Sequence, residues 1–307
     1  MADVRENPTS TSLATLAGFG AILLWSTTVA LVRSLSEQVG PVSAAAAVYL
    51  VSGALSAGVL FGSARKRQQL GQLSPAYLIG CGLLFIVYMI ALYLAVGRAS
   101  DRQQVLEVGL LNYLWPSLTI LFSLALLRKK ATWILLPGTL LALVGIFLVL
   151  TQGAAVSWSS FSQNVFGNPL AYSMAAVAAV SWGLYSTLTR KWAGGQDEGA
   201  VVLFLPATAL VLVPLACLFD EPRKWSYRCA AETLFLGFAT YFAYLLWDHA
   251  MRRGNVVLVA AGSYLTPLLS TVASCLYLAV APKPQLWVGC VVLVVGSVLS
   301  WRAIGNQ

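Results

Sequence analysis

Charged residues are scarce in this chain of 307 residues: they make up 10% of it, whereas hydrophobic residues make up 59%. A soluble domain carries about 25% charged residues, so this composition excludes an ordinary soluble protein. The mean hydropathy of +0.78 is that of an integral membrane protein. Long uncharged intervals recur along the sequence, and a span needs about 20 apolar residues, so we expect an all-α membrane protein. The ten expected transmembrane helices lie near residues 13–33, 42–62, 76–97, 104–127, 133–151, 169–190, 200–219, 231–251, 256–280 and 286–302.

Histidine and cysteine are also sparse, with one histidine and five cysteines that show no CxxC spacing. The sequence has no Gly-rich phosphate loop either. These absences leave no material for a catalytic triad, a metal centre or a nucleotide site. We therefore predict that the chain is not an enzyme and has no catalytic residues, no metal and no cofactor.

The net charge of +8 does not indicate a nucleic-acid partner, because the basic residues lie at the ends of the apolar intervals rather than on one folded surface. Twelve of the 19 Lys and Arg fall on the side shared by both termini and the loops from even-numbered to odd-numbered helices. By the positive-inside rule, both termini should be cytoplasmic. Residues 1–12 lack the features of a cleaved signal peptide and are expected to form a cytoplasmic tail.

The two halves of the sequence match at a nearly constant spacing, which indicates an internal repeat. A Trp and an Arg eight residues apart, at 25 and 33, recur 157 residues later, and Pro116 recurs as Pro267 at an offset of 151. The glycines at 138 and 145 recur at 289 and 296, and weaker matches occur at offsets of 155 and 158. We predict two five-helix repeats, 13–151 and 169–302, joined by a loop at 152–168. Since five is odd, the second repeat should be inverted, an arrangement typical of transporters with a site between the repeats.

Proline interrupts two of the expected helices, each time three residues after a tyrosine. Proline removes its own N–H and clashes with the carbonyl four residues earlier, so the carbonyls of Asn112 and Ser263 should lose their helical partners. In lipid, such a break is tolerated where protein, water or a ligand satisfies the backbone. Pro116 and Pro267 are therefore candidate hinges that line a cavity. The alternative is a kink that only shapes packing.

Together, the ten spans in two repeats, the Trp-x7-Arg pairs, the matched prolines and the Gly-x6-Gly pairs resemble the drug/metabolite transporter superfamily, in its EamA-type branch. The resemblance covers essentially the whole chain, and within the superfamily it extends to exporters of aromatic amino acids in the bacterial inner membrane. It implies export of Phe, Tyr, Trp and related small metabolites through a central cavity that opens alternately to each side.

A site for a free aromatic amino acid needs apolar rings and a few polar groups for the ammonium and the carboxylate. Midspan aromatic residues and the polar residues at the proline breaks meet this need. The candidates are Trp25, Tyr88, Asn112, Tyr113, Trp115, Trp182, Tyr185, Tyr241, Tyr244, Ser263 and Tyr264. The alternatives are that the rings are membrane-interface anchors and that the polar groups hold helices together.

Ionisable residues crowd the ends of the expected helices, where Asp248 should pair with Arg252 four residues on. No carboxylate lies clearly at the midplane, which disfavours a dication as substrate. Two alternatives remain open: export of a purine, a branched amino acid or an organic cation by the same fold, and a non-transporting membrane scaffold. The expected partners are a small-molecule substrate and the lipid bilayer, and the sequence is compatible with a monomer.

Overall fold

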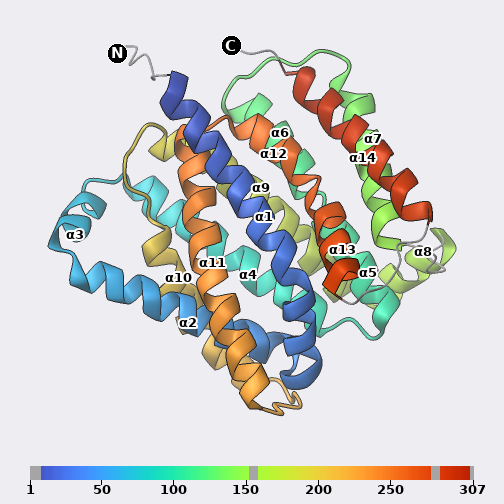
Figure 1. Ribbon diagram of the computed structural model, residues 1–307, viewed down its shortest axis with the longest axis horizontal. Coiled ribbons are helices and arrows are strands. Elements are labelled where there is room, and N and C mark those ends of the chain that lie inside the picture. Colours follow the sequence, from blue (N-terminus) through green and yellow to red (C-terminus); the bar gives the residue numbers. More distant parts are fainter. Residues whose placement is uncertain (1–7, 152–157, 278–283, 305–307) are drawn as a thin grey trace.

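The computed structural model describes residues 8–151, 158–277 and 284–304, which are mostly helical (Figure 1). Within these ranges the only β pairing is an isolated bridge between Ala131 and Ile304. The elements in chain order are α1 (Pro8–Val39), α2 (Pro41–Gly62), α3 (Ala64–Leu70), the π-helix η1 (Ala76–Cys81), α4 (Gly82–Gly97), α5 (Arg102–Asn112), α6 (Trp115–Leu126), α7 (Leu135–Thr151), α8 (Trp158–Gly167), α9 (Pro169–Ala193), α10 (Val201–Cys217), α11 (Tyr227–Arg253), α12 (Val256–Ser263), α13 (Thr266–Tyr277) and α14 (Pro284–Arg302).

Each of the ten expected apolar segments forms a helix or a pair of consecutive helices. Two short helices go beyond the prediction. The Ser63 side chain accepts a hydrogen bond from the backbone N–H of Lys66 and so caps α3. Residues 158–167 form α8 where the sequence predicts a loop, and Phe161 of α8 packs its ring 5.7 Å from that of Tyr172. The predictions for 1–7, 152–157 and 278–280 fall outside the described residues.

Five helical stretches are long and apolar enough to cross a membrane, namely Thr11–Thr28, Pro41–Gly62, Ala76–Gly97, Gln103–Leu126 and Tyr227–Arg253. The bent pair of α12 and α13 makes a sixth, and the apolar helices at Leu135–Thr151, Val201–Cys217 and Leu286–Arg302 are shorter. The helix α9 does not meet the same measure of apolarity. Its Ser, Thr and Tyr side chains are largely buried among other helices, which shields them from lipid.

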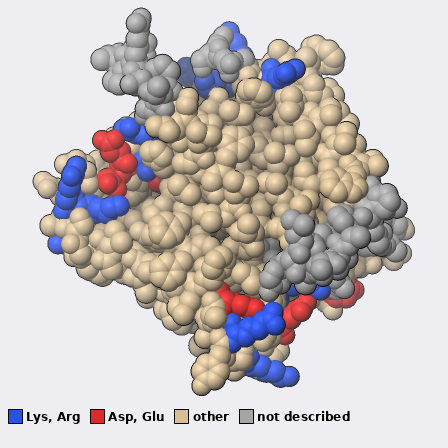
Figure 2. Space-filling view, viewed as in Figure 1, with Lys and Arg blue, Asp and Glu red and all other residues tan. Residues whose placement is uncertain are grey.

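Charged side chains gather towards the rims of the molecule and leave a broad uncharged face between them (Figure 2). Large apolar side chains such as Leu121, Leu210 and Val291 are more than half exposed. In water such a surface would be unfavourable, but it suits a hydrocarbon environment. The chain is therefore a multi-pass membrane protein.

Both proline breaks occur where the sequence places them. The helix α5 ends at Asn112 and α6 begins at Trp115, and α12 ends at Ser263 and α13 begins at Thr266. The axes of α12 and α13 differ by 43°. Proline alone is not sufficient for a break, since α10 continues through two prolines, at 206 and 214.

The helices α7 and α14 lie side by side (Figure 1) and make matched contacts. A Cβ on Gly145 would lie 2.5 Å from Leu293, and a Cβ on Gly296 would lie 2.2 Å from Ala142. These two contacts are equivalent under the repeat, because residue 145 corresponds to 296 and residue 293 corresponds to 142 at the offset of 151. The contact of residue 138 with 300 and the contact of residue 289 with 149 are equivalent in the same way. Numbers rise along one helix as they fall along the other, so the helices are antiparallel. The two halves are thus related here by a two-fold exchange.

The central helices follow the same exchange. The helix α1 packs against α11 and α13, while α9, its counterpart in the second half, packs against α4 and α6. The helix α2 packs against its own counterpart, α10. The first helix of each half therefore packs against the third and fourth helices of the other half. This interlocking places the ring of Trp25 on α1 5.9 Å from the ring of Trp182 on α9, centroid to centroid.

Candidate functional site

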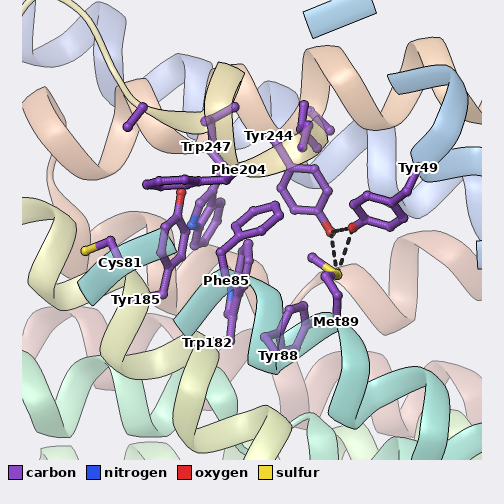
Figure 3. Close-up of a cluster of buried hydrophobic side chains, with 14 of the residues drawn as sticks. Tyr49, Cys81, Phe85, Tyr88, Met89, Trp182, Tyr185, Phe204, Tyr244 and Trp247 are labelled. Atoms are coloured by element: carbon purple, nitrogen blue, oxygen red, sulfur yellow. Dashed lines mark hydrogen bonds between the residues drawn. The ribbon is translucent and has the colours of Figure 1, made fainter. Parts of the chain in front are cut away.

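Aromatic rings from both halves meet between α1, α2, α4, α6, α9, α10 and α11 (Figure 3). The N-terminal half and the C-terminal half contribute equally to this set. We call it the aromatic cluster, and its members are Trp25, Tyr49, Phe85, Tyr88, Trp115, Trp182, Tyr185, Phe204, Tyr244 and Trp247.

Trp182 is the hub of the aromatic cluster. Its ring centroid lies 4.6–6.1 Å from those of seven other members. The nearest are Tyr88 at 4.6 Å and Tyr185 at 5.0 Å, and its counterpart Trp25 makes an edge contact at 5.9 Å. Such ring pairs stabilise by about 0.5–1.5 kcal/mol each beyond the burial of their area. Because Trp182 is only 2% exposed, these contacts form away from water.

Small residues of α9 allow other helices to approach Trp182. Ala178 and Ala179 are buried on α9, and a Cβ on Gly183 would lie 3.0 Å from the Cβ of Leu118 on α6. A larger side chain at 183 would push α6 away and carry Trp115 with it. The Ala-rich sequence of α9 is therefore what places rings from several helices within reach of one tryptophan.

Hydrogen bonds fix the orientation of three cluster rings. The Tyr49 hydroxyl donates to the Tyr244 hydroxyl at 2.9 Å, and the Tyr244 hydroxyl lies 3.7 Å from the sulfur of Met89 (Figure 3). The indole N–H of Trp247 donates to Ser186 Oγ at 3.3 Å. The polar tips of these rings are therefore occupied, which leaves the ring faces for contacts with other rings or with a ligand.

Three polar atoms, two at the proline breaks and one in the aromatic cluster, are buried and have no hydrogen-bond partner in the described part of the chain. They are Asn112 Oδ1, the Tyr185 hydroxyl and Thr266 Oγ1. The side chain of Asn112 lies beside the Tyr88 hydroxyl, and Tyr185 contacts the rings of Trp182 and Phe85. A buried polar atom without a partner costs about 1–3 kcal/mol. These atoms are candidates for contacts with a polar ligand.

The structure brings together only part of the predicted site. Trp25, Tyr88, Trp115, Trp182, Tyr185 and Tyr244 join the aromatic cluster, with Asn112 beside it. Tyr113 and Tyr264 belong instead to a second apolar cluster around α6, α7, α12 and α14. There the Tyr264 hydroxyl lies 2.7 Å from Ser117 Oγ, and Ser263 donates to the carbonyl of Ala260. Tyr241 is buried and contacts the ring of Phe242, and both Pro116 and Pro267 are buried.

Four members of the aromatic cluster are absent from the sequence-based set, namely Tyr49, Phe85, Phe204 and Trp247. Two of them carry a sequence signal. Phe85 lies three residues before Tyr88, and Trp247 three residues after Tyr244, so each shares a helix face with a predicted residue. For Tyr49 and Phe204 the sequence offers no such pairing, because their position depends on how α2 and α10 pack.

A buried ionic network closes the end of the molecule where α11 terminates. Arg252 Nε donates to Asp248 Oδ2 at 2.8 Å, so the predicted pair is present, but it is buried rather than interfacial. The Tyr77 hydroxyl of η1 donates to Asp248 Oδ1 at 2.5 Å and accepts from the backbone N–H of Ala200 at 3.0 Å. Arg252 also donates to the carbonyls of residues 196 and 197. Losing one partner of such a pair costs about 3–5 kcal/mol, so this end is held firmly.

Among the described residues, no group of three or more His, Cys, Asp or Glu could hold a metal ion. The buried carboxylate of Glu107 accepts hydrogen bonds from neutral donors, Gln103 Nε2 at 2.9 Å, Asn164 Nδ2 at 3.1 Å and the Tyr172 hydroxyl. These contacts join α5, α8 and α9. What the site offers is therefore ring faces and a few unpaired polar atoms, which suit binding of an aromatic molecule.

Comparison with known proteins agrees with this geometry. The model of the EamA-like transporter family matches residues 12–151 and again residues 169–302. The chain is 38% identical to the aromatic amino acid exporter YddG of Escherichia coli K12, over 94% of this chain and 97% of that protein. It is 40% identical to the aromatic amino acid exporter YddG of Salmonella typhimurium over the same shares. A solved crystal structure that is 31% identical superposes with a TM-score of 0.77, covering 94% of this chain and 96% of the other.

Proposed function

Since this chain belongs to the EamA-like transporter family, we propose that it exports the aromatic amino acids Phe, Tyr and Trp across a bacterial inner membrane. The observation that carries the proposal is the aromatic cluster, in which Trp182 contacts seven rings. The names of the relatives, which are transporters rather than enzymes, support it. We propose no catalytic step, cofactor or metal for this chain.

We infer that the chain forms ten spans as two inverted five-helix halves, 13–151 and 169–302. The connector is 152–168, which includes α8, and the cytoplasmic tail is 1–12, whose last residues belong to the first turns of α1. The exchanged contacts of the antiparallel α7 and α14 support the inversion, and the double family match supports the duplication. The helix α1 begins and α14 ends at the same end of the molecule (Figure 1). The excess of Lys and Arg assigns that end to the cytoplasm.

In this proposal the substrate ring stacks on the aromatic cluster, and its charged groups meet the unpaired polar atoms. Trp25 keeps partial exposure and offers a ring edge at the surface of the cluster. The ammonium can donate to Asn112 Oδ1, and the carboxylate can accept from the Tyr185 or Thr266 hydroxyl. The substrate would thus supply hydrogen-bond partners to two of these three buried groups, which a purely apolar molecule of the same size cannot do.

Transport then requires that the two halves tilt about this site, with the breaks at 113–114 and 264–265 as hinges. Substrate binding can shift the balance between the two arrangements only by as much as its affinity differs between them. The hinge role of Pro116 and Pro267 rests on the matched positions of the two breaks. Ser263, Tyr113 and Tyr264 act in this account as packing residues next to the hinges.

Replacing both hinge prolines by alanine should slow export about tenfold. Each alanine restores a backbone N–H, and each new helical hydrogen bond favours a straight helix by on the order of 1 kcal/mol. The measurement is the initial rate of release of labelled Phe from liposomes for Pro116→Ala combined with Pro267→Ala. Pro214→Ala is the matched control, because Pro214 lies exposed within an unbroken helix. Unchanged release in the double variant would assign both prolines to packing alone.

Export itself can be tested in bacterial cells that are fed a dipeptide containing Phe and that lack their own exporters of aromatic amino acids. Cells that produce this protein should tolerate the dipeptide and accumulate Phe in the medium, and Trp182→Leu should abolish the effect. A dipeptide that releases only Leu serves as the substrate control. Equal protection against both dipeptides would show that the site binds apolar molecules in general and not aromatic ones in particular. No protection would contradict export.

A further inference from the structure

The helices α4 and α11 correspond at an offset of 155, and their glycines contact corresponding helices. Gly82 on α4 recurs as Gly237 on α11. A Cβ on Gly82 would meet Phe204 of α10 at 2.9 Å, and a Cβ on Gly237 would meet Val51 of α2 at 2.4 Å. Since α2 and α10 are themselves counterparts, the two glycines occupy equivalent places. Residues of α4 can therefore be matched to their counterparts in α11, and across the π-helix η1, whose wider turn holds an extra residue, the match extends to within one position.

At the end where α11 terminates, Tyr77 and Asp248 join the two halves. Both side chains are buried, and the hydroxyl donates to the carboxylate at 2.5 Å. The ring of Tyr77 packs 5.9 Å from that of Phe204, a member of the aromatic cluster, and Asp248 follows Trp247 in sequence. This contact therefore closes the molecule directly beside the proposed site.

The counterparts of these residues at the opposite end carry the same chemistry with the roles exchanged. At an offset of 155, Tyr77 corresponds to Glu232 and Asp248 corresponds to Tyr93. Each end thus has one phenol and one carboxylate. At this second end the pair is not formed, because Glu232 Oε2 is buried and has no hydrogen-bond partner among the residues that the structure describes. The other oxygen, Oε1, accepts from Ser34 at 3.0 Å and from Arg228 at 2.8 Å.

Helix packing shows the same asymmetry. The helix α11 packs against α9, and near the Tyr77 and Asp248 contact Arg190 of α9 donates a hydrogen bond to the carbonyl of Arg252. The equivalent contact would join α4 to α1, and in the described part of the chain these helices have no comparable contact. Tyr93 instead packs its ring 6.4 Å from that of Tyr49. The molecule is therefore closed where α11 ends and less tightly closed where α11 begins.

We propose that the Tyr77 and Asp248 pair and the Tyr93 and Glu232 pair are alternative closing contacts, so that the protein forms one or the other. The inference rests on the proposed function, since it assumes two arrangements of inverted halves. The structure has the first pair formed and so faces the non-cytoplasmic side. When the halves tilt, the Tyr77 hydroxyl leaves Asp248, and the Tyr93 hydroxyl donates to the unpaired Oε2 of Glu232. In each arrangement one carboxylate accepts a hydrogen bond from a tyrosine hydroxyl, and the other carboxylate lacks that bond.

A cross-linking experiment tests the approach of residues 93 and 232 without any substrate. In a variant whose native cysteines are replaced by serine or alanine, Tyr93→Cys and Glu232→Cys are combined and the protein in liposomes is treated with a mercuric ion. We expect slow cross-linking, accelerated about tenfold by Tyr77→Phe, because that change removes a hydrogen bond to a charged group from the present arrangement. Tyr93→Cys with Tyr227→Cys is the control pair, since Tyr227 is fully exposed.

A double-mutant cycle tests the Tyr93 and Glu232 pair without the introduced cysteines. Tyr93→Phe should slow release of labelled Phe about tenfold although its hydroxyl is not bonded to Glu232 in this structure, and Tyr93→Phe with Glu232→Gln should be no slower than either single variant. Tyr227→Phe should change nothing. Absence of the cross-link in both backgrounds, or additive effects in the cycle, would overturn the proposal. If cross-linking behaves as expected but aromatic amino acids are not released, the proposed substrate is wrong. The proposal of two alternative closing contacts would then still stand.

Discussion

Trp182→Leu is expected to reduce the release of labelled Trp and Phe from liposomes about 100-fold. The leucine fills most of the volume but removes all seven ring contacts that meet at Trp182. Loss of two favourable ring pairs at the substrate, at up to about 1.5 kcal/mol each, accounts for a factor of that size. The same variant should release Leu about as fast as the unaltered protein, because an apolar contact does not need a ring.

Two further variants separate binding from folding. Trp182→Phe keeps a ring at the hub and should lose much less activity than Trp182→Leu. Trp133→Leu removes a tryptophan that is 81% exposed and should be neutral. If Trp182→Leu remains monodisperse in detergent and still releases Trp and Phe at the normal rate, the aromatic cluster is a packing core and not the substrate site.

Gly296→Val is expected to lower the apparent Tm in detergent by about 10 °C. A Cβ at this position would lie 2.2 Å from the backbone nitrogen of Ala142 and 2.7 Å from the carbonyl oxygen of Gly138. Backbone atoms cannot move aside without separating α7 from α14, and overpacking of this kind costs about 3 kcal/mol or more. Unfolding followed by intrinsic tryptophan fluorescence measures the shift.

The two-fold exchange gives this prediction an internal control. Gly145→Val should destabilise the protein to a similar extent, because its Cβ would meet Leu293 in the equivalent contact. Gly58→Ala in α2 meets no atom within 4 Å and should be neutral or stabilise by about 0.5–1 kcal/mol. A harmless Gly296→Val would show that α7 and α14 do not pack closely in the membrane.

The helices and their breaks could be predicted from the sequence because their causes are local. Apolar runs of span length gave the positions of the helices, and the missing N–H of proline gave the two breaks. The limit of that reasoning is visible in α10, where Pro206 and Pro214 leave the helix continuous. Pro116 and Pro267 each lie in the first turn of the helix that follows the break and are buried, whereas Pro206 is partly buried and Pro214 is exposed. Sequence alone does not report that burial. The same holds for α8, whose helix is supported by its contacts with α5 and α9.

The aromatic character of the site could be predicted from the sequence, but only some of the residues that form it. Tryptophan and tyrosine at midspan indicated rings facing one another, and the repeat placed Trp25 opposite Trp182. Tyr113 and Tyr264 carry the same sequence signal, yet they face α7 and α14 rather than the aromatic cluster, because the rotation of a broken helix about its axis depends on tertiary packing. The pairing of Asp248 with Arg252 followed from their spacing. Its burial depends on Tyr77, which lies 171 residues away in sequence.

The central claim is that aromatic amino acids cross the membrane through this protein by stacking on the aromatic cluster. The most direct measurement uses purified protein in liposomes loaded with radiolabelled Trp, Phe, Leu or adenine, with empty liposomes and Trp182→Leu as references. The account predicts rapid release of Trp and Phe, much slower release of Leu and adenine, and loss of that preference in the variant. Release of Leu or adenine as fast as Trp, with no effect of Trp182→Leu, would contradict it.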